Sequence, residues 1–316
     1  MNTRKPDFFI VGAAKAGTTA LYSYLSQHPE VYMSPIKEPN YFSKDVVLEH
    51  LRPQVKKRLE AENLSQYFKD GMNRILHRAY IRDEQLYLQL FSSASPDVKA
   101  GEASASYLYS SVAANEIKKF NPAAKIIIIL REPAARAYSH YLMDLKLGFV
   151  KSDFANALAE DAKAEPKGWG ASSLYKELGL YAEQVERYLS IFPKEQVLIL
   201  LYDDLKKDEK ESLRKIYHFL GINEEFIPDK SGFRNESAVP SGTIARLLLR
   251  SGSIRVKMRN LLENTPLKPL LLKILYKKPI LTDQDSNTIR QLQQGYKNDI
   301  QKLSALIQRD LQQWLK

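Results

Sequence analysis

One strand–loop–helix unit near the N-terminus constrains the fold of this chain more than any other stretch. The run Asp7–Val11 is apolar after its first residue and ends at Gly12, as buried parallel strands do. Thr18–Gln27 then places apolar residues at helical spacing, and a loop of small residues joins the two. Such a unit is the usual building block of a parallel sheet that carries helices on its faces.

Two later apolar runs repeat this pattern. Lys125–Leu130, "KIIIIL", is rich in β-branched residues, and Pro133 suits the first turn of a helix that we expect to continue to about Lys146. Gln196–Tyr202, "QVLILLY", follows an amphipathic helix expected over Ser173–Ile191. Strands that alternate with helices predict an α/β class: a P-loop-like, three-layer fold with a central parallel sheet flanked by helices.

The remaining segments are expected to form loops and helices around this core. Val46–Phe91 is charged and helix-leaning, and we expect it to cover one edge of the sheet; Asp161–Gly170 predicts a surface loop. From Ile244 onward the period is helical and ends in the amphipathic run Asn298–Leu315. The 316 residues show no internal repeat, so we expect one domain over 1–316, with a core at about 7–240 and a helical tail at about 241–316.

Composition narrows the classes of function. The net charge is +10 with a pI near 9.4, which favours an anionic ligand, an acidic polymer, nucleic acid or a membrane surface, although many soluble proteins are simply basic. Cysteine is absent, which excludes disulfides, thiolate zinc sites and a cysteine nucleophile. The first apolar run breaks at Lys15, so it indicates a strand rather than a signal peptide, and no run has the length of a membrane span. We therefore expect a soluble, cytoplasmic protein.

The loop "GAAKAGTT" indicates an anion site. Aligned on Gly12 and Gly17, it resembles a nucleotide phosphate-binding loop, except that Thr18 occupies the lysine position and Lys15 lies inside the loop. At the carboxyl end of a parallel strand, such a loop and the helix after it offer N–H groups to an anion, with hydroxyls from Thr18 and Thr19. The alternative is a small-residue turn with a solvated lysine.

The stretch "LREPAARAYSHY" supplies a second candidate site. Arg131 comes at a strand end and Ser139 lies on the following helix, so both side chains can face one phosphate. Arg136 is an alternative anion ligand, and either arginine could instead be an ordinary surface residue. His140, in the same stretch, is interpreted as a helix-packing residue rather than a part of the catalytic machinery.

A nucleotide kinase or ATPase with an atypical loop is the alternative enzyme class. Such an enzyme needs a lysine after the second glycine and an acidic residue at another strand end to hold Mg²⁺. The "KIIIIL" strand ends in Arg131, whereas "QVLILLYDD" ends in Asp203 and Asp204, which we interpret first as a helix N-cap. A protein that binds an anion without turnover is the third possibility, and no recognised nucleic-acid-binding module is visible.

Five stretches together resemble the sulfotransferases that use 3′-phosphoadenosine 5′-phosphosulfate. They occur in the family's order over about residues 7–220 and are most similar to the bacterial branch related to heparan sulfate and carbohydrate sulfotransferases. Their sequences are "VGAAKAGTTALYSYLSQHPEV", "KEPNYF", "GEASASYLY", "KIIIILREPAARAYSHYLM" and "YAEQVERYLSIFPKEQVLILLYDDL".

The resemblance implies transfer of a sulfuryl group from this donor to a hydroxyl, and in second place an amine, of an acceptor such as a carbohydrate. The products would include adenosine 3′,5′-bisphosphate, and the family uses no catalytic metal. Lys15 matches the lysine at the bridging oxygen, and Arg131 and Ser139 match the pair that holds the 3′-phosphate. Arg234, in "FRNESAVPSG", matches a late loop that closes over the nucleotide. The matching 5′-phosphate ligands are Ala16, Gly17, Thr18, Thr19 and Ala20.

The resemblance also proposes the general base. Glu38, in "SPIKEPNYF", matches a glutamate that takes the acceptor proton in the heparan branch, and its stretch is too polar and proline-bounded to predict a core strand. The alternatives are that Glu38 only pairs with Lys37 or Lys15, or that Glu102 is the base. Relatives that act on heparan sulfate have lysine where this chain has Ala103, which argues against a heparan-like acceptor. The acceptor wall is expected from 46–91 and 149–170.

Overall fold

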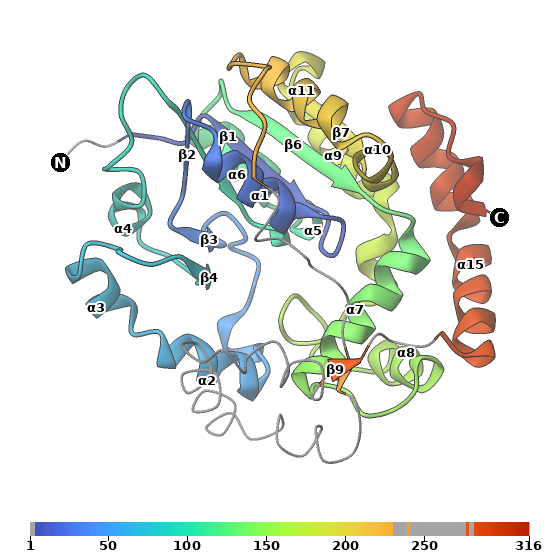
Figure 1. Cartoon of the computed structure of the whole chain (residues 1–316). Coiled ribbons are helices and arrows are strands. Elements are labelled where there is room, and N and C mark those ends of the chain that lie inside the picture. Colours follow the sequence, from blue (N-terminus) through green and yellow to red (C-terminus); the bar gives the residue numbers. More distant parts are fainter. Residues whose placement is uncertain (1–3, 230–238, 241–275, 278–280, 316) are drawn as a thin grey trace.

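The computed structural model describes residues 4–229, 239–240, 276–277 and 281–315, and a five-stranded parallel sheet lies at its centre (Figure 1). Helices lie on both faces of the sheet, so the predicted α/β class is confirmed. The strand order is β2-β5-β1-β6-β7, and every neighbouring pair is parallel. The strands are β1 (Phe8–Gly12), β2 (Val31–Met33), β5 (Lys99–Ala103), β6 (Lys125–Leu130) and β7 (Val197–Leu201).

The helices and the short strands complete the described chain. The α-helices are α1 (Thr18–Gln27), α2 (Pro53–Ala61), α3 (Leu64–Lys69), α4 (Glu84–Gln89), α5 (Ser106–Tyr109), α6 (Ala113–Phe120), α7 (Pro133–Leu147), α8 (Phe154–Ala162), α9 (Tyr181–Ile191), α10 (Tyr202–Lys207), α11 (Glu209–Leu220) and α15 (Asp283–Ile307). Single 3₁₀ turns span Leu48–His50, Glu177–Gly179, Lys194–Gln196 and Gln312–Leu315. Two small sheets pair β3 (Ile36–Glu38) with β4 (Leu76–Arg78) and β8 (Val239–Pro240) with β9 (Tyr276–Lys277).

The central strand β1 creates the place where a ligand can bind. It pairs with β5 on one side and β6 on the other, with Phe9 in register with both Glu102 and Ile126. After β1 the chain builds β2 and β5 on one side of it, and then crosses to build β6 and β7 on the other side. Because the strands are parallel, the carboxyl ends of β1, β5 and β6 lie together at the same end of the sheet. Open α/β sheets bind their ligands at such a switch point.

The helices and the strand with the clearest local sequence patterns were predicted correctly. The helix predicted over Thr18–Gln27 and the strand predicted over Lys125–Leu130 have the expected bounds. Helix α7 begins at Pro133 and extends one residue beyond the expected end. The Glu132 carboxylate caps its first turn, and Gly148, in the left-handed region, ends it.

The helix predicted over Ser173–Ile191 was wrong in its first half, because α9 begins only at Tyr181. The Asp161 carboxylate accepts the N–H groups of Ser173, Leu174 and Tyr175, which fixes these residues in an irregular segment. Asp299 of α15 then accepts the N–H groups at the start of α9. Both carboxylates are distant in sequence, so no local pattern revealed this boundary.

The segment over Val46–Phe91 forms short helices as expected, but it also contains β4. This strand pairs with β3, so the expectation that the stretch around Glu38 is no core strand was wrong: all three residues of β3 are buried. Strands β2 and β5 were not predicted either. The sequence of β5, "KAGEA", has little β propensity, and pairing with β1 decides its conformation.

The C-terminal helical tail packs on the central core. The side chains of Tyr296 and Ile300 on α15 belong to the same buried cluster as β1, and α15 contacts α7 and α9. Helix α15 ends at Ile307, where Gln308 adopts a left-handed conformation, so the run Asn298–Leu315 is not one helix. The tail boundary expected near residue 241, and the helical period expected from Ile244, fall largely outside the described residues.

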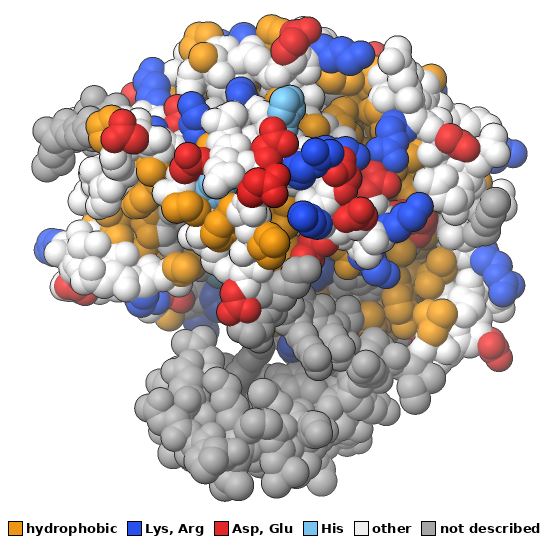
Figure 2. Space-filling view, turned by 45° about the horizontal axis from the view of Figure 1, so that its top comes forward, with side chains coloured by type: hydrophobic (Ala, Val, Ile, Leu, Met, Phe, Trp, Pro, Cys, Tyr) orange, Lys and Arg blue, Asp and Glu red, His pale blue; other side chains and the backbone are white. Residues whose placement is uncertain are grey.

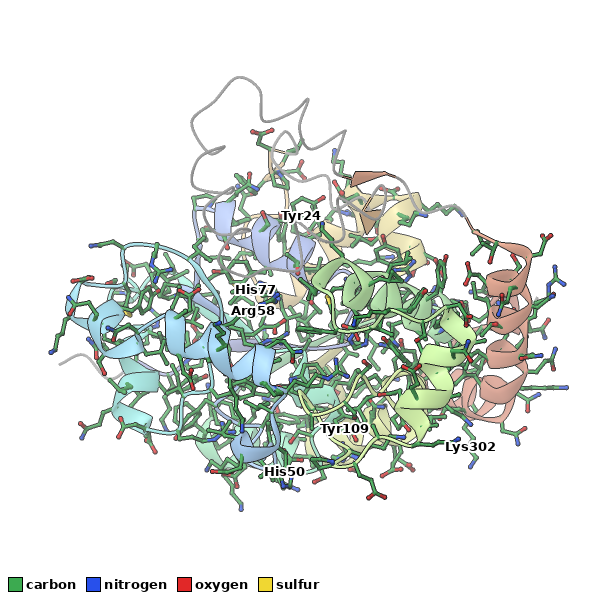
Figure 3. All side chains as sticks on the ribbon, turned by 90° about the horizontal axis from the view of Figure 1, so that it is seen from below. Tyr24, His50, Arg58, His77, Tyr109 and Lys302 are labelled. Atoms are coloured by element: carbon green, nitrogen blue, oxygen red, sulfur yellow. The ribbon has the colours of Figure 1, made fainter. Side chains whose placement is uncertain are left out.

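The molecular surface mixes both signs of charge. Figure 2 shows acidic and basic side chains interspersed on one face, so the positive surplus does not form a uniform patch there. Figure 3 places α2, with Arg58, on one side of the molecule and α15, with Lys302, on the other. In the part of the chain that the structure describes, no helix has the length and apolarity needed to cross a membrane.

Candidate active site

The loop after β1 depends on two glycines. A Cβ atom on Gly12 would lie 2.6 Å from the Cβ atom of Leu108, which is too close for any other residue. Gly17 adopts a φ of 105° and lies so close to the ring of Tyr202 that a Cβ atom would approach it to 3.1 Å. The N–H group of Ala13 donates to the Ile129 carbonyl at 2.7 Å, which ties the loop to β6.

The first turn of α1 leaves N–H groups open toward this loop. The N–H groups of Ala16 and Ala20 already donate to the carbonyls of Ala13 and Gly17. Those of Thr18 and Thr19 have no acceptor among the residues that the structure describes. The N–H group of Gly17 is likewise without an acceptor there, so Gly17, Thr18 and Thr19 are the predicted 5′-phosphate ligands that can bind an anion through the backbone.

Lys15 brings a partly buried positive charge to the same loop. Its φ is 67°, and its Nζ atom lies 3.7 Å from the Sδ atom of Met143 on α7. No described carboxylate lies within 4.0 Å of this ammonium group. Burial, with a further contribution from Arg131, lowers the pKa of Lys15 to about 8. A bound anion would stabilise the charged form and raise this pKa again.

Arg131 lies beside Lys15, as the sequence predicted. Its Nη1 atom donates to the Lys15 carbonyl at 3.2 Å, and its guanidinium carbon lies 4.9 Å from the ring centre of Tyr202. The hydroxyl of Tyr181 donates to the Arg131 carbonyl at 3.0 Å, which fixes the backbone at the end of β6. Ser139 lies on the second turn of α7 and is 9% exposed. Among the described residues, no hydrogen bond joins its hydroxyl to Arg131, whose side chain donates to the Lys15 carbonyl.

Two alternatives from the sequence are not favoured by the geometry. The Arg136 side chain is fully buried and donates to the Tyr175 carbonyl, so it lies in the core rather than at the loop.

Asp203 and Asp204 stand in the first turn of α10, whose N-cap is Leu201, so their interpretation as a helix N-cap was wrong. They bind the C-terminal segment instead: Asp203 accepts from Trp314 Nε1 at 2.9 Å, and Asp204 pairs with Arg309 at 2.9 Å.

Glu38 lies in β3 between two cations. Its Oε1 atom is 3.0 Å from Lys37 Nζ, and its Oε2 atom is 2.8 Å from an Nη atom of Arg78. Burial alone would raise the pKa of Glu38, but Lys37 and Arg78 together hold it well below its usual range. Of the two alternative ion pairs, the one with Lys37 exists and the one with Lys15 does not, and no sequence pattern predicted the further partner, Arg78.

Glu102 occupies a different environment on β5. Its side chain is fully buried near the hydroxyls of Tyr107 and Tyr87. Burial raises the pKa of Glu102 to about 8. The carboxyl group is therefore protonated near neutral pH and has no exposure to solvent, which disfavours it as the competing base.

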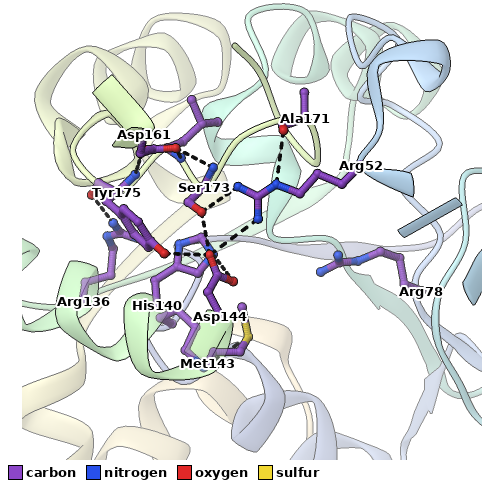
Figure 4. A network of polar contacts seen from close by, with 12 residues as sticks. Arg52, Arg78, Arg136, His140, Met143, Asp144, Asp161, Ala171, Ser173 and Tyr175 are labelled. Carbon is purple, nitrogen blue, oxygen red and sulfur yellow. Dashed lines mark hydrogen bonds and ion pairs between the residues drawn. The ribbon is translucent and has the colours of Figure 1, made fainter. Parts of the chain in front are cut away.

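A polar network on α7 adjoins the loop (Figure 4). Asp144 is 2% exposed and accepts hydrogen bonds from Ser173 Oγ at 2.5 Å and the Tyr175 hydroxyl at 2.8 Å. Arg52 Nη1 lies 3.7 Å from the same carboxylate, and His140 Nε2 lies 3.8 Å from it. Burial and then Arg136 lower the pKa of His140 well below its usual range, so its ring is neutral.

His140 also packs as the sequence predicted, because its ring meets that of Tyr175 edge-on at 5.3 Å. The roles of Arg52, Arg78 and Asp144 were missed. Each has its partner 29 to 121 residues away, and no spacing rule joins them. Arg234 lies outside the described residues, and among the described residues no group of three or more His, Asp or Glu side chains could hold a metal ion.

Comparison with known protein families identifies the domain. The model of the sulfotransferase domain family matches residues 5–241. A solved sulfotransferase structure from Alicyclobacillus acidocaldarius superposes with a TM-score of 0.69 at 28% identity, covering 99% of this chain and 100% of that one.

Curated relatives are carbohydrate-modifying enzymes. Carbohydrate sulfotransferase 15 of Mus musculus is 30% identical over 254 residues, covering 69% of this chain and 44% of that protein. The bifunctional heparan sulfate N-deacetylase/N-sulfotransferase 3 of Homo sapiens is 29% identical over 225 residues, covering 69% and 22%. This chain thus spans less than half the length of either relative.

Proposed function

Because the chain belongs to the sulfotransferase domain family, we propose that it transfers a sulfuryl group from 3′-phosphoadenosine 5′-phosphosulfate to a hydroxyl of an acceptor, and in second place to an amine. One observation carries the proposal. Lys15 and Arg131 meet beside the open first turn of α1, and no described carboxylate is within 4.0 Å of either cation. A donor with a 5′-phosphosulfate and a 3′-phosphate supplies the anions that this arrangement lacks.

Each end of the donor has its own ligands in this proposal. Lys15 and the N–H groups of Thr18 and Thr19 bind the 5′-phosphosulfate, with Gly17 allowing the close approach. Arg131 and Ser139 bind the 3′-phosphate. Ala16, Ala20 and Arg234 stay predictions, because the first two amides already donate elsewhere and Arg234 is outside the described residues.

The proposed chemistry is an in-line transfer. The acceptor oxygen forms a bond to sulfur while the bond from sulfur to the bridging phosphate oxygen breaks, which leaves adenosine 3′,5′-bisphosphate. Lys15 would stabilise the charge that develops on the leaving phosphate.

Glu38 is the proposed base for the acceptor proton. With its low pKa it is a weak base toward a free hydroxyl. It becomes adequate as the bond to sulfur forms, because the acceptor proton is then far more acidic.

The names of the curated relatives support a carbohydrate acceptor. A direct test incubates the protein with donor carrying radiolabelled sulfur and a panel of neutral and acidic oligosaccharides, with and without a chelator. We expect label to move to at least one acceptor and the rate to be unaffected by the chelator.

Phosphate transfer from ATP that needs added Mg²⁺, without sulfuryl transfer, would instead establish the kinase alternative. The engagement of Asp203 and Asp204 by Trp314 and Arg309 argues against that alternative. A binding-only protein would retain the bisphosphate in calorimetry and transfer nothing.

Three further expectations stay predictions. The single-domain organisation is supported by the shared core of α15 and β1, since a separable tail would bury its own cluster. The cytoplasmic location and the lack of a nucleic-acid partner rest on the sequence alone.

A further inference from the structure

The ammonium group of Lys15 remains without a contact anion although a carboxylate stands nearby. Asp144 follows Met143 on α7, and Met143 touches Lys15 Nζ at 3.7 Å. Asp144 is the carboxylate that opposes the lowering of the Lys15 pKa, yet the two side chains lie more than 4.0 Å apart and form no ion pair. The charge of Asp144 thus acts on Lys15 from a distance.

Two hydroxyl donors and one cation from other segments hold the Asp144 carboxylate in this position. Ser173 Oγ and the Tyr175 hydroxyl both donate to Oδ2, at 2.5 and 2.8 Å. The guanidinium of Arg52 approaches the same oxygen to 3.7 Å and donates to Ser173 Oγ at 2.7 Å. In Figure 4 Ser173 and Tyr175 reach Asp144 from the 171–175 segment, and Arg52 extends toward it from a separate part of the chain, beside Ala171.

The 171–175 segment, which carries Ser173 and Tyr175, is itself fixed by hydrogen bonds. The Asp161 carboxylate accepts the N–H groups of Ser173 and Tyr175 at 2.7 and 2.9 Å. Arg52 donates from Nε to the Ala171 carbonyl at 3.2 Å and from its backbone N–H to the Gly170 carbonyl at 3.0 Å. Because both ends are anchored, the donors keep Asp144 in one orientation.

We propose that Arg52, Ser173 and Tyr175 are positioning residues that hold the Asp144 carboxylate away from Lys15, so that the ammonium group is charged but unpaired until the donor binds. The proposal deepens the function given above and rests on Lys15 contacting the phosphosulfate. A contact ion pair would have to be broken at each binding event, and a Lys15 without any nearby carboxylate would lose its proton more easily among cations. The other titratable and charged groups near it are Arg131, Arg136, Lys146, His140 and His77.

A purely structural role for this network would predict something different. Loss of structural hydrogen bonds lowers the stability in every variant, with no consistent effect on Lys15. The positioning role instead predicts that the pKa of Lys15 falls when the Asp144 carboxylate is removed. It predicts that the same pKa rises when the side chains that hold this carboxylate are removed.

The experiment measures the titration of Lys15 in the full chain without any donor. The pH dependence of acetylation at Lys15, read by mass spectrometry against the other lysines, reports its pKa. Asp144→Asn should move the midpoint down by about one pH unit, because the opposing charge is lost. Ser173→Ala combined with Tyr175→Phe should move it up by a similar amount, because the released carboxylate can reach the ammonium group.

Matched controls remove equivalent hydroxyls outside the network. Ser172→Ala and Tyr188→Phe should leave the Lys15 midpoint unchanged, since Ser172 bonds within the 168–172 turn and Tyr188 bonds the Tyr107 carbonyl. Should the double variant fail to fold, Arg52→Gln replaces it, with an upward shift expected because a cation beside Asp144 is removed. Midpoints that stay fixed, or that shift in the same direction in both classes of variant, would overturn the proposal.

Donor binding separates this inference from the proposed function. The double variant Ser173→Ala, Tyr175→Phe should bind adenosine 3′,5′-bisphosphate at least several-fold more weakly than the wild type does, as measured by calorimetry. If wild-type protein binds neither this nucleotide nor the phosphosulfate donor while the opposite titration shifts are seen, the proposed function fails, and only the part of the inference that concerns the position of Asp144 relative to Lys15 is retained.

Discussion

Neighbouring cations lower the pKa of both Lys15 and Glu38, but the effect on charge is opposite: the lysine loses its charge more easily, and the glutamate keeps its charge. Lys15 is partly buried beside Arg131; desolvation and then this neighbouring cation lower the pKa of Lys15 to about 8, so its protonation responds to a bound anion. Glu38 is buried between Lys37 and Arg78, which hold its pKa well below its usual range and so keep it ionised at neutral and mildly acidic pH. An acidic limb in the pH profile of transfer would therefore have to come from another group.

Replacement of Arg131 tests the 3′-phosphate site. Arg131→Ala should weaken binding of adenosine 3′,5′-bisphosphate by about 2–4 kcal/mol, the usual cost of leaving a largely desolvated charge without its partner. Isothermal titration calorimetry measures this directly, and Arg309→Ala, which removes an arginine paired with Asp204 at the surface, is the matched control. Equal affinity in the Arg131 variant and the wild type would remove Arg131 from the site.

Replacement of Glu38 tests the general base. Glu38→Gln should reduce sulfuryl transfer at least about a hundredfold, within the range expected of a positioned base. Bisphosphate affinity should hold within about threefold, because the donor ligands lie on other elements, and thermal stability should fall, since buried Lys37 loses its carboxylate.

A matched variant separates the carboxylate from its ion pair. Arg78→Lys keeps a cation beside Glu38 and should retain most of the transfer rate. Comparable losses in the two variants would show that the ion pair, rather than the basic oxygen, is what the reaction requires.

At the scale of elements, the C-terminal turn is part of the wall behind the site. Trp314 is 1% exposed, its Nε1 atom donates to Asp203 at 2.9 Å, and its ring meets that of Tyr181. Tyr181 in turn bonds the backbone of Arg131 at 3.0 Å. The tail therefore supports the end of β6 through two contacts.

This arrangement predicts a large cost for the loss of Trp314. Trp314→Ala should lower the free energy of unfolding by about 3–5 kcal/mol, as for other large buried aromatic side chains. Denaturant unfolding measures the change, and Gln313→Ala, at the neighbouring exposed position, should change it by less than about 0.5 kcal/mol. A small effect of the Trp314 variant would indicate that the tail is only loosely packed.

At the scale of the whole molecule, one core carboxyl group makes stability depend on pH. Glu102 stays protonated in the folded protein up to about pH 8, whereas in the unfolded chain it ionises above its ordinary pKa of 4.5. The unfolded state thus binds fewer protons in this window. Glu102 therefore contributes a fall in the free energy of unfolding as the pH rises through this window, of about 1.4 kcal/mol per pH unit.

Glu102→Gln should remove this dependence while it keeps a side chain of the same size. The stability of the variant relative to wild type should therefore increase steadily from about pH 5 to about pH 8 in denaturant unfolding. The exposed Glu186→Gln is the control and should show a constant difference. A constant difference for Glu102→Gln as well would mean that Glu102 is ionised in the folded state.

Some features of this protein follow from the sequence because their signals are local. The apolar run Lys125–Leu130 can only be a buried strand, and the capped start at Pro133 and the glycine at 148 define α7. The loop Gly12–Thr19 indicated an anion site because small residues, a lysine and a helix start occur together, and the structure brings Lys15 and Arg131 into contact there.

Other features were decided only by the tertiary structure. Strands β3 and β5 are short and rich in polar or small residues, so pairing with β4 and β1, rather than their own propensity, makes them strands. The partners of charged groups are equally hidden. Glu38 meets Arg78 40 positions later, and Arg52 meets Ser173 121 positions later. A buried charge takes whichever partner the packed chain places beside it, and that neighbour is a property of the fold, not of sequence spacing.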